Sequence, residues 1–561
     1  MHRISRTELR WNGWGRYDHT FDLKGHDQEF WQMVCEATGG GVLPDTPGPS
    51  LEEMPVEPTA LTEDDLDALR AIVGGDHVHV DRYERLFHAA GKSYLDLLRI
   101  RARALRGAPD AVVYPATAEH VAALLAWATK NDAVVIPFGG GSSVVGGVEA
   151  RRPEGRKAVI TIDTTRMNAV LSLDPVSLLA TVQAGLYGPE LEEALQSRGF
   201  TLGHFPQSFE FSTLGGWIAA RGAGQQSNRY GTADKFLSSA RVVAPTGLLR
   251  TVDFPQSAAG PNLNQLIAGS EGTLGVITDA TVKVHPVPAE RDLRTWLFPS
   301  FAAGADAVRG IVQGDVSVAM MRLSDAEETK FYSKFGSLGK SISGVKKLAK
   351  GVFKFSPWGK EPCLLLVGFE GDAHHIEFSR DAVGRIARKN GGLPLGKGPG
   401  QSWWKGRFEM PYLRDPLMDR GVGVDTLETA TWWSNINDLH KRVRDSLRAS
   451  LRETGTEAII MSHISHSYAS GASLYFTFIF RRDLNDPEAQ WWKVKSRASD
   501  TILSYGGTIS HHHGVGADHL PWMESDKGTL GVVTLTAAQK ALDPAGIMNP
   551  GKLLPVVGEG R

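Results

Sequence analysis

Three glycine-rich runs between residues 139 and 275 are the feature that most limits how this chain can fold. The first, 139–147, follows a short buried strand at 134–136, while the other two, 212–224 and 269–275, each come before a strand. Helical spacing of apolar residues precedes the first run, so helices and strands alternate here. We therefore expect a mixed α+β segment whose three loops together hold one large cofactor.

The first glycine run fits neither of the common nucleotide-binding loops. A Rossmann loop needs G-x-G-x-x-G between a strand and a helix, but here the glycines stand at 139, 140, 141, 146 and 147 and a strand follows. A Walker A loop would need Gly-Lys-Ser or Gly-Lys-Thr, which is absent. What remains is a row of unobstructed backbone N–H groups that can bind a phosphate without a helix dipole. The alternative is an ordinary tight turn.

Length and composition exclude several classes of protein. The 561 residues are too many for one core, and we expect roughly two to four subdomains. A content of 22 % charged and 42 % hydrophobic residues is ordinary for a water-soluble chain. With 61 Lys+Arg against 63 Asp+Glu, the net charge of −2 gives no overall field for nucleic acid. Two cysteines cannot build a disulfide framework, so redox chemistry would need a cofactor.

No stretch approaches the ~18 apolar residues of a membrane span. We also expect neither a secretory leader nor a peroxisomal tripeptide, because the first residues lack an apolar core and the chain ends in Gly-Glu-Gly-Arg.

Changes in residue composition and in the pattern of expected helices and strands along the chain indicate four parts. Residues 1–58 form an N-terminal arm with scattered tryptophans and a Pro-rich end, which we expect to lie extended over another domain. The glycine runs fall in 59–288. Beyond Pro288 the pattern changes to alternating helices and strands with fewer glycine clusters, which we assign to a second domain, 289–500. Residues 501–561 form a C-terminal segment.

Three consecutive histidines, His511, His512 and His513, stand in the C-terminal segment. In extended backbone the outer two would face one way and the middle one the other, and no Cys, Asp or Glu follows until Asp518, so a metal site is disfavoured. Imidazole titrates nearest neutral pH, and the glycines that follow let another molecule approach closely, which favours a proton-transfer site. The alternative is a solvated turn.

The segment 330–360 carries eight lysines and no acidic residue, with aromatic and aliphatic residues between them. This pattern predicts either a solvated basic loop or an interfacial segment whose aromatic residues enter the headgroup region of a membrane while its lysines meet anionic lipid. Nucleic acid is a weaker third interpretation, because the rest of the chain has no basic groove.

Several motifs, taken together and in this order, resemble those of the FAD-linked oxidase superfamily that includes vanillyl-alcohol oxidase. The glycine runs, Gly-Ser-Glu-Gly-Thr-Leu-Gly-Val at 269–276 and Asn-Pro-Gly-Lys at 549–552 carry this resemblance. Within the superfamily the chain is similar to the alkyldihydroxyacetonephosphate synthases, through Arg-Trp-Asn-Gly-Trp-Gly at 10–15, Phe-Ser-Thr-Leu-Gly-Gly-Trp at 211–217 and Ser-His-His-His-Gly-Val-Gly at 510–516. The last motif is the most specific, because relatives that oxidise D-2-hydroxy acids typically have Gly-Glu-His-Gly-Ile-Gly there.

The resemblance implies an α+β fold with a two-subdomain FAD-binding domain of the vanillyl-alcohol oxidase type at 59–288 and an α+β cap domain at 289–500. The segment 501–561 would complete the flavin domain and the active site. The implied cofactor-binding residues are Pro137, Phe138, Gly139, Gly140, Gly141, Ser142, Ser143, Gln207, Ser208, Phe209, Glu210, Phe211, Ser212, Thr213, Ala220, Arg221, Gly222, Ala223, Ser270, Glu271, Gly272, Thr273, Leu274, Gly275, Val276 and Ile277.

In that family the acyl chain of acyl-dihydroxyacetone phosphate is exchanged for a fatty alcohol without net redox, which gives an ether lipid precursor. The implied catalytic residues are Tyr468, His511, His512, His513 and Arg322, the implied substrate-phosphate residue is Arg414, and no metal is implied. A guanidinium suits a phosphate, and a phenol with a pKa near ~10 needs an adjacent imidazole or cation to act as a base.

Each of these residues also has a plainer interpretation. Arg414 could pair with Asp415 at the surface, Tyr468 could be a half-buried cap residue, and Arg322 could be a salt-bridged strand end. The resemblance leaves open an FAD-linked oxidase or dehydrogenase of a hydroxy acid, and a flavin-free protein that binds lipid surfaces.

We expect a bacterial, cytoplasmic, peripherally membrane-associated enzyme that touches the membrane through 330–360. It would take lipid-like substrates and bind no nucleic acid. The sequence does not decide between a monomer and a homodimer.

Overall fold

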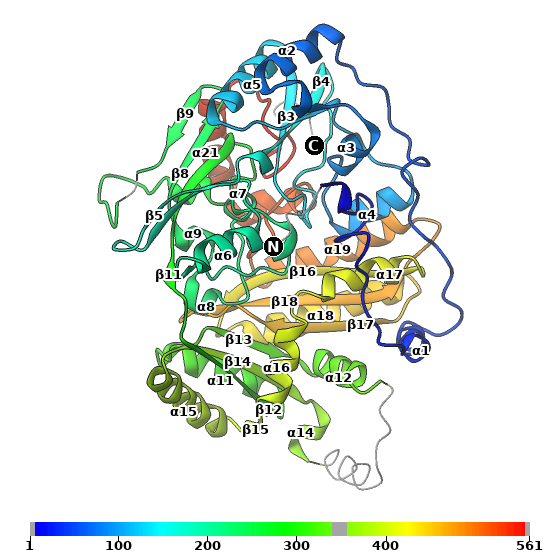
Figure 1. The fold of residues 1–561 in the computed structure, drawn as a ribbon. Coiled ribbons are helices and arrows are strands. Elements are labelled where there is room, and N and C mark those ends of the chain that lie inside the picture. Colours follow the sequence, from blue (N-terminus) through cyan, green and yellow to red (C-terminus); the bar gives the residue numbers. More distant parts are fainter. Residues whose placement is uncertain (1–5, 253, 339–355, 556–561) are drawn as a thin grey trace.

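The computed structural model describes residues 6–252, 254–338 and 356–555. In Figure 1 these residues form two regions stacked one above the other, with the glycine-rich part above a large sheet and its helices. The N-terminal arm runs down one side of both regions, and the last residues return to the upper one.

The upper region contains a small mixed sheet that carries the first glycine run. Its strands lie in the order β1-β2-β4-β3. Strands β3 and β4 are almost wholly buried. Because they run parallel, both end at the same edge of the sheet, where the run 139–147 begins. The elements of this part are α2 (Glu63–Val73), β1 (Val78–His79), α3 (Arg82–Phe87), α4 (Tyr94–Arg101), β2 (Ala111–Val113), α5 (Ala118–Lys130), β3 (Ala133–Phe138) and β4 (Ala158–Asp163).

A second, antiparallel sheet of the upper region has the strand order β5-β6-β10-β8-β9. Its long strand β10 begins directly after the third glycine run, as the sequence predicts. The elements are β5 (Val170–Asp174), β6 (Leu179–Gln183), α6 (Gly188–Gln196), β7 (Phe200–Thr201), α7 (Leu214–Ala219), α8 (Ser227–Tyr230), α9 (Ala233–Phe236), β8 (Leu237–Ala244), β9 (Gly247–Arg250), α10 (Asn264–Ile267), β10 (Val276–Lys283) and β11 (His285–Pro286).

The lower region is built on a seven-stranded antiparallel sheet in the order β15-β12-β14-β13-β17-β18-β16. Along β18 the residues Leu474, Phe476 and Phe478 are buried in a core with the helices that cover one face, while the alternate residues Tyr475 and Thr477 point to the opposite face.

The elements of the lower region are β12 (Glu290–Phe298), α11 (Phe301–Gln313), β13 (Met320–Ser324), α12 (Ala326–Phe335), α14 (Pro357–Lys360), β14 (Cys363–Gly371), α15 (Ala373–Lys389), β15 (Leu393–Gly396), α16 (Gly398–Lys405), α17 (Arg414–Met418), β16 (Val422–Trp432), α18 (Ile436–Glu453), β17 (Ala458–Ile464), β18 (Gly471–Arg481) and α19 (Pro487–Ser504).

The N-terminal arm begins with the 3-10 turn η1 (Arg6–Glu8) in the upper region and reaches the lower one. Its Trp14 N–H donates to the Asp415 carboxylate at 2.7 Å. Its Pro-rich part, 42–58, contains no helix or strand, but the arm also contains α1 (Asp27–Ala37), whose Phe30 and Val34 are buried in an apolar cluster with residues of the large sheet. The arm therefore ties the two regions together.

The C-terminal segment contains α20 (Met523–Lys527) and α21 (Thr529–Leu542) and then returns to the first sheet. Val135 N–H donates to Ile547 O at 2.9 Å, and Asn549 N–H donates to Val135 O at 2.9 Å. Residues 547–549 thus lie beside β3 and extend the sheet that bears the first glycine run.

The predicted α+β class is confirmed: the described glycine-rich part has a four-stranded sheet, a five-stranded sheet and the two-stranded sheet of β7 and β11, and one large sheet lies beyond it. Among the helices of the described residues, none combines the length and the apolar character needed to cross a bilayer. The centre of the predicted basic segment, 339–355, lies outside the described residues.

Candidate active site

A cavity of about 1750 Å³ lies between the two regions. Its upper wall is made by the glycine runs, its lower wall by the free face of the seven-stranded sheet, and the N-terminal arm closes part of it through Trp14 and side chains between His19 and His26. Pockets for small ligands usually measure about 300–1,000 Å³, so this cavity can hold a large cofactor together with a substrate.

The first glycine run gives the cavity a site suited to a phosphate. A Cβ atom on Gly139 or on Gly140 would clash with the segment 211–213, so only glycine lets the loop lie this close to it. The N–H groups of Gly140, Gly141 and Ser142 meet no acceptor in the part of the chain that the structure describes. These free donors and the size of the cavity fit the diphosphate of FAD.

Most of the implied cofactor-binding residues line the cavity. They are Pro137, Phe138, Gly139, Gly140, Gly141, Ser142, Ser143, Gln207, Ser208, Ser212, Thr213, Ala220, Gly222, Ala223, Glu271, Gly272, Gly275, Val276 and Ile277. The residues that do not line it are Phe209, Glu210, Phe211, Arg221, Ser270, Thr273 and Leu274. Several of these have other partners: Leu274 is a core residue, and the Thr273 hydroxyl donates to Ser270 O at 2.7 Å and closes a turn.

Glu271, one of the implied cofactor residues, uses its carboxylate to accept hydrogen bonds from the main chain. Its two oxygens accept the N–H groups of Val515 and Gly516 at 2.6 and 2.7 Å. Burial raises the pKa of Glu271 to about 7, although these two hydrogen bonds act in the opposite direction. The third glycine run therefore positions the segment that follows the histidine triplet.

Four residues on the free face of the large sheet form a row across neighbouring strands. Arg322 lies on β13 and His463 on β17, and the strand register pairs His463 with Tyr475 and Tyr475 with Glu428. Arg322 donates to Glu328 Oε1 at 2.8 Å, and its second Nη lies 3.0 Å from His463 Nε2. Burial opposes ionisation of Glu328, but Arg322 and His463 lower its pKa to about 2. Arg322 is thus part of a buried charged network that reaches the cavity.

Glu428, at the end of this row, holds the histidine triplet. Its carboxylate accepts the main-chain N–H groups of His511, His512 and His513 at 2.6, 3.1 and 3.0 Å, and the Ser510 hydroxyl at 2.8 Å. Burial would raise the pKa of Glu428, but the three histidines and the N–H groups lower it well below its usual range. An ionised, fully buried carboxylate therefore determines the path of the triplet.

The triplet wraps around Glu428, so its side chains do not alternate as extended backbone predicted. His511 Nδ1 lies 3.0 Å from His512 Nδ1, and His511 Nε2 lies 2.6 Å from the Tyr468 hydroxyl. His466 stacks on the His511 ring at 5.1 Å between centroids. Nitrogen atoms of His466, His511 and His512 lie within 4.8 Å of one another, a separation that a metal ion could span.

The imidazoles of this cluster are neutral at neutral pH. Burial lowers the pKa values of His466 and His512 well below their usual range, and it also lowers that of His511, whereas Glu428 acts in the opposite direction. Burial raises the pKa of Tyr468 to about 12, and the charges of Asp234 and Glu428 add to this effect. The cluster can therefore accept a proton near pH 7, and its phenol stays protonated.

Arg414 is not engaged in the surface ion pair considered from its sequence. Asp415, the neighbour that would pair with it, is buried and contacts Trp14 and Arg101 instead. Arg414 lines the cavity, its guanidinium donates no hydrogen bond to any residue that the structure describes, and its buried Nε has no partner. Burial lowers its pKa, although Asp415 and Asp425 act in the opposite direction. An unpaired guanidinium at this place is suited to bind an anion.

Sequence reasoning missed Glu428, His463, His466 and Glu328. Glu428 is separated from the triplet by more than eighty residues, and no local motif surrounds it. His463 and His466 stand three and six residues after Ile460, in the strand and loop that precede Tyr468. Their closeness to Tyr468 in the sequence is a signal for a shared site, but two separate histidines near a strand end are weak evidence.

Comparisons with known proteins identify the relatives of the chain. Residues 109–253 match a family model described as FAD binding domain, and residues 287–553 match FAD linked oxidases, C-terminal domain. Alkyldihydroxyacetonephosphate synthase of Dictyostelium discoideum is 36 % identical over 98 % of this chain and 94 % of its own length.

Solved structures agree. A structure of alkyldihydroxyacetonephosphate synthase superposes with a TM-score of 0.83 and 34 % identity, covering 98 % of this chain and 99 % of that one. A structure of p-cresol methylhydroxylase with substrate bound has a TM-score of 0.67 at 15 % identity, covering 90 % of this chain and 100 % of that one, which shows a shared fold alone. The resemblance drawn from the sequence motifs is confirmed.

Changing Glu428 to Gln should destabilise the protein, because the variant keeps the size of the side chain but removes its charge. Hydrogen bonds to charged groups contribute about 1.5–3 kcal/mol each, so we expect the free energy of unfolding at pH 7 to fall by at least about 3 kcal/mol in denaturant titrations. The control is Glu457→Gln, whose exposed carboxylate pairs with Arg452 and which should change stability by less than about 1 kcal/mol. Equal stability of the two variants would contradict the role assigned to Glu428.

Proposed function

The chain belongs to the alkyldihydroxyacetonephosphate synthase family, and we propose that it exchanges the acyl chain of acyl-dihydroxyacetone phosphate for a fatty alcohol with FAD as cofactor. When bound, FAD supplies a flavin ring that takes part in the exchange and ends in the redox state in which it began. Its diphosphate would meet the free N–H groups of Gly140, Gly141 and Ser142. One observation carries the substrate class: an unpaired arginine and an apolar wall face the same cavity.

The apolar wall supports a long hydrocarbon chain as part of the substrate. It lies between the arm, α12, α17 and the large sheet, and most of its members belong to one hydrophobic cluster. Its residues include Phe21, Leu23, Phe335, Leu338, Met410, Leu413, Leu417, Met461 and Ile479. Each buried methylene group contributes about 0.8 kcal/mol to binding, so a long chain gains much from this wall.

Arg414 supports a phosphate as the polar end of the same substrate. It stands at the start of α17, next to the apolar residues Leu413 and Leu417. A substrate with one phosphate and one alkyl tail can satisfy the guanidinium and the apolar wall at once. A small hydroxy acid would leave that wall in contact with water.

The histidine cluster supports proton transfer during the exchange. The fatty acid leaves with the ester oxygen and the alcohol oxygen forms the new bond, so the hydroxyl proton of the alcohol must be taken up. His512 lines the cavity and is linked through His511 to the Tyr468 hydroxyl. Since both imidazoles are neutral near pH 7, this row can accept the proton as the new bond forms, and the lowered pKa values make it a transient acceptor.

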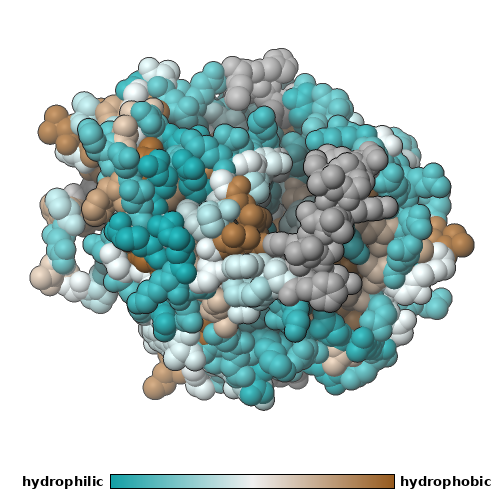
Figure 2. All heavy atoms as spheres, turned by 90° about the horizontal axis from the view of Figure 1, so that it is seen from below, coloured by the Kyte–Doolittle hydropathy of each residue, from teal (hydrophilic) through white to brown (hydrophobic). Residues whose placement is uncertain are grey.

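We also propose contact with a membrane surface, through which the chains of the substrates would enter. Lys330, Lys334 and Phe335, at the described start of the basic segment, lie on the cavity wall. Figure 2 views the molecule from below, onto the lower region, and shows that the described surface there is mainly hydrophilic, with hydrophobic residues in small separate patches. Attraction to the membrane would therefore rest on the lysines of 330–360, whose centre lies outside the described residues.

Replacing Tyr468 by Phe should lower the rate of exchange about 10²- to 10⁴-fold while FAD stays bound, because the phenol is the end of the proton-accepting row. The measurement is the formation of ether product from acyl-dihydroxyacetone phosphate and a long-chain alcohol. Replacing Tyr505, a surface tyrosine over which Arg442 lies, by Phe is the control.

In the native enzyme the rate should fall only below pH 6.5, since a lowered histidine pKa keeps the acceptor neutral down to that point.

Unchanged exchange in Tyr468→Phe would contradict the proton-accepting role. An enzyme that makes no ether product but reduces its flavin with D-lactate would instead be an oxidoreductase of a hydroxy acid, the other function considered from the sequence.

Replacing Arg414 by Lys should raise the KM for acyl-dihydroxyacetone phosphate by about tenfold or more, because an ammonium group cannot bind a phosphate through two parallel hydrogen bonds. The KM for the alcohol should stay unchanged. The matched control is Arg420→Lys, six residues further on, where the arginine stacks on Trp31. Equal KM values for both substrates in both variants would argue against phosphate binding by Arg414.

Changing Lys346, Lys347, Lys350 and Lys354 to Ser should weaken binding to anionic vesicles. Each lysine near an anionic surface is worth about 1 kcal/mol, so the native protein should sediment with anionic vesicles and be released as salt rises. Neutral vesicles are the control. Equal binding of both proteins to both kinds of vesicle, or no binding at all, would rule out the membrane role of 330–360.

A further inference from the structure

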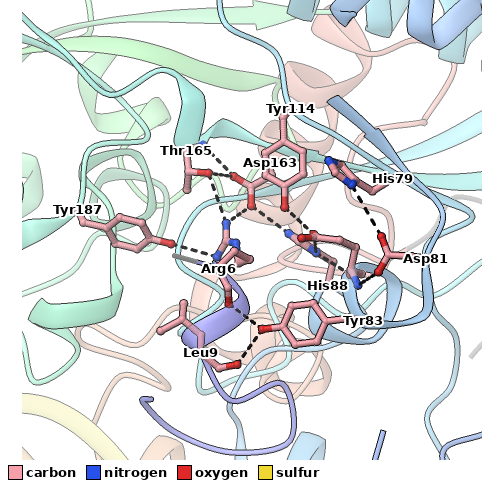
Figure 3. Close-up of polar contacts among 11 residues, drawn as sticks. Arg6, Leu9, His79, Asp81, Tyr83, His88, Tyr114, Asp163, Thr165 and Tyr187 are labelled. Atoms are coloured by element: carbon pink, nitrogen blue, oxygen red, sulfur yellow. Dashed lines mark hydrogen bonds and ion pairs between the residues drawn. The ribbon is translucent and has the colours of Figure 1, made fainter. Parts of the chain in front are cut away.

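Arg6, in the N-terminal arm, reaches into the interior of the upper region. Its guanidinium forms an ion pair with Asp163, which is fully buried, and donates to the Tyr187 hydroxyl at 3.0 Å. The Tyr83 hydroxyl lies 2.7 Å from the carbonyl oxygen of Arg6 and 2.8 Å from that of Leu9, and its single proton can be donated to either, which holds the arm in place. Figure 3 shows Tyr187 and His88 pointing toward the Arg6–Asp163 pair, while Tyr83 points toward the main chain of Arg6 and Leu9.

The Asp163 carboxylate depends on Arg6 for its charge balance. It also accepts hydrogen bonds from Thr165 N–H at 2.8 Å and lies 2.9 Å from His88 Nε2. Burial would raise the pKa of Asp163, but Arg6 and His88 hold it below its usual value. The carboxylate is therefore ionised, and Arg6 is its permanently charged partner.

Asp163 stands directly beside the first glycine run. The register of the parallel strands pairs it with Phe138, the last residue of β3, and the Thr164 hydroxyl donates to Phe138 O at 3.1 Å. Arg6 lies over the ring of Phe138, with 5.9 Å from its Cζ to the ring centroid, and His88 contacts the same ring with 4.4 Å between centroids. One layer of side chains thus connects the arm to the start of the glycine run.

The ring of Phe138 in turn supports the loop above it. Gly141 has φ +68°, and a Cβ atom at this position would clash with the Phe138 ring, so the loop lies directly on the ring. Displacement of Phe138 would therefore displace the N–H groups that face the cavity. Arg6 borders a separate cavity of about 300 Å³. It is not among the residues that line the main cavity.

We propose that Arg6 is a positioning residue for the cofactor, which acts through Asp163 and Phe138 to hold residues 139–142 in the conformation that binds the FAD diphosphate. The proposal rests on the proposed function, because it takes this loop as the diphosphate site. It makes the N-terminal arm a component of the cofactor site although no atom of Arg6 reaches the cofactor.

The test compares the native protein with Arg6→Met and with Arg16→Met. Arg16 lies in the same arm but pairs with Asp18 at the surface. Two quantities are measured: the FAD dissociation constant of reconstituted protein, and hydrogen exchange of the peptide containing residues 138–143 in cofactor-free protein. We expect Arg6→Met to weaken FAD binding about tenfold or more and to speed exchange in that peptide, while Arg16→Met behaves like the native protein.

A second variant separates positioning from general damage. In Arg6→Met together with Asp163→Asn, the carboxylate no longer carries an unpaired charge, so FAD affinity should recover by several fold relative to Arg6→Met alone. Arg6→Lys keeps the charge but cannot contact Asp163 and Tyr187 together, and its affinity should lie between those of the native protein and Arg6→Met.

The proposal fails if Arg6→Met binds FAD as tightly as Arg16→Met, or if its exchange rate rises equally in all peptides. A native protein that cannot be reconstituted with FAD would contradict the proposed function. A native protein that binds FAD, with an Arg6→Met variant that binds it equally well, would contradict only this inference.

Discussion

A single ionised and fully buried carboxylate, that of Glu428, governs the arrangement of the site. It lies on the edge strand of the large sheet and receives three successive backbone N–H groups from a segment more than eighty residues further along the chain. A charge in this position is tolerable only because so many donors surround it. The same hydrogen bonds give the histidine segment its shape, so the demand of one buried charge decides where several imidazoles lie.

That arrangement explains why so many histidines remain uncharged beside a negative group. Attraction by Glu428 favours protonated imidazole, but burial opposes it more strongly, and the pKa values of His511 and His512 end below their usual range. The result is a set of neutral bases in a region of negative potential. Arg322 and Glu328 repeat the principle at the other end of the same row, where each charge is balanced by the other.

The parts of the fold that the sequence predicts well are those determined by local patterns. The glycine runs and the buried strand before the first of them depend on neighbours in the chain, and strand β10 begins where the third run ends. Around the cavity, the triplet and Arg414 were indicated by the family resemblance. Glu428 and His466 were not, because their roles arise from contacts between distant segments. The expected alternation of His511, His512 and His513 was wrong for the same reason, since extended backbone gave way to a turn around a carboxylate.

The return of the chain to its first sheet has a consequence for the order in which the protein can mature. Ile547 and Asn549 bond to Val135 on either side, the Asn549 side chain donates to Gly147 O and to Glu271 O, and the Lys552 ammonium donates to Glu149 O. The first sheet therefore lacks this neighbour until synthesis has passed residue 552. A chain that stops before residue 547 would be left with an open sheet edge at β3 that other chains could occupy.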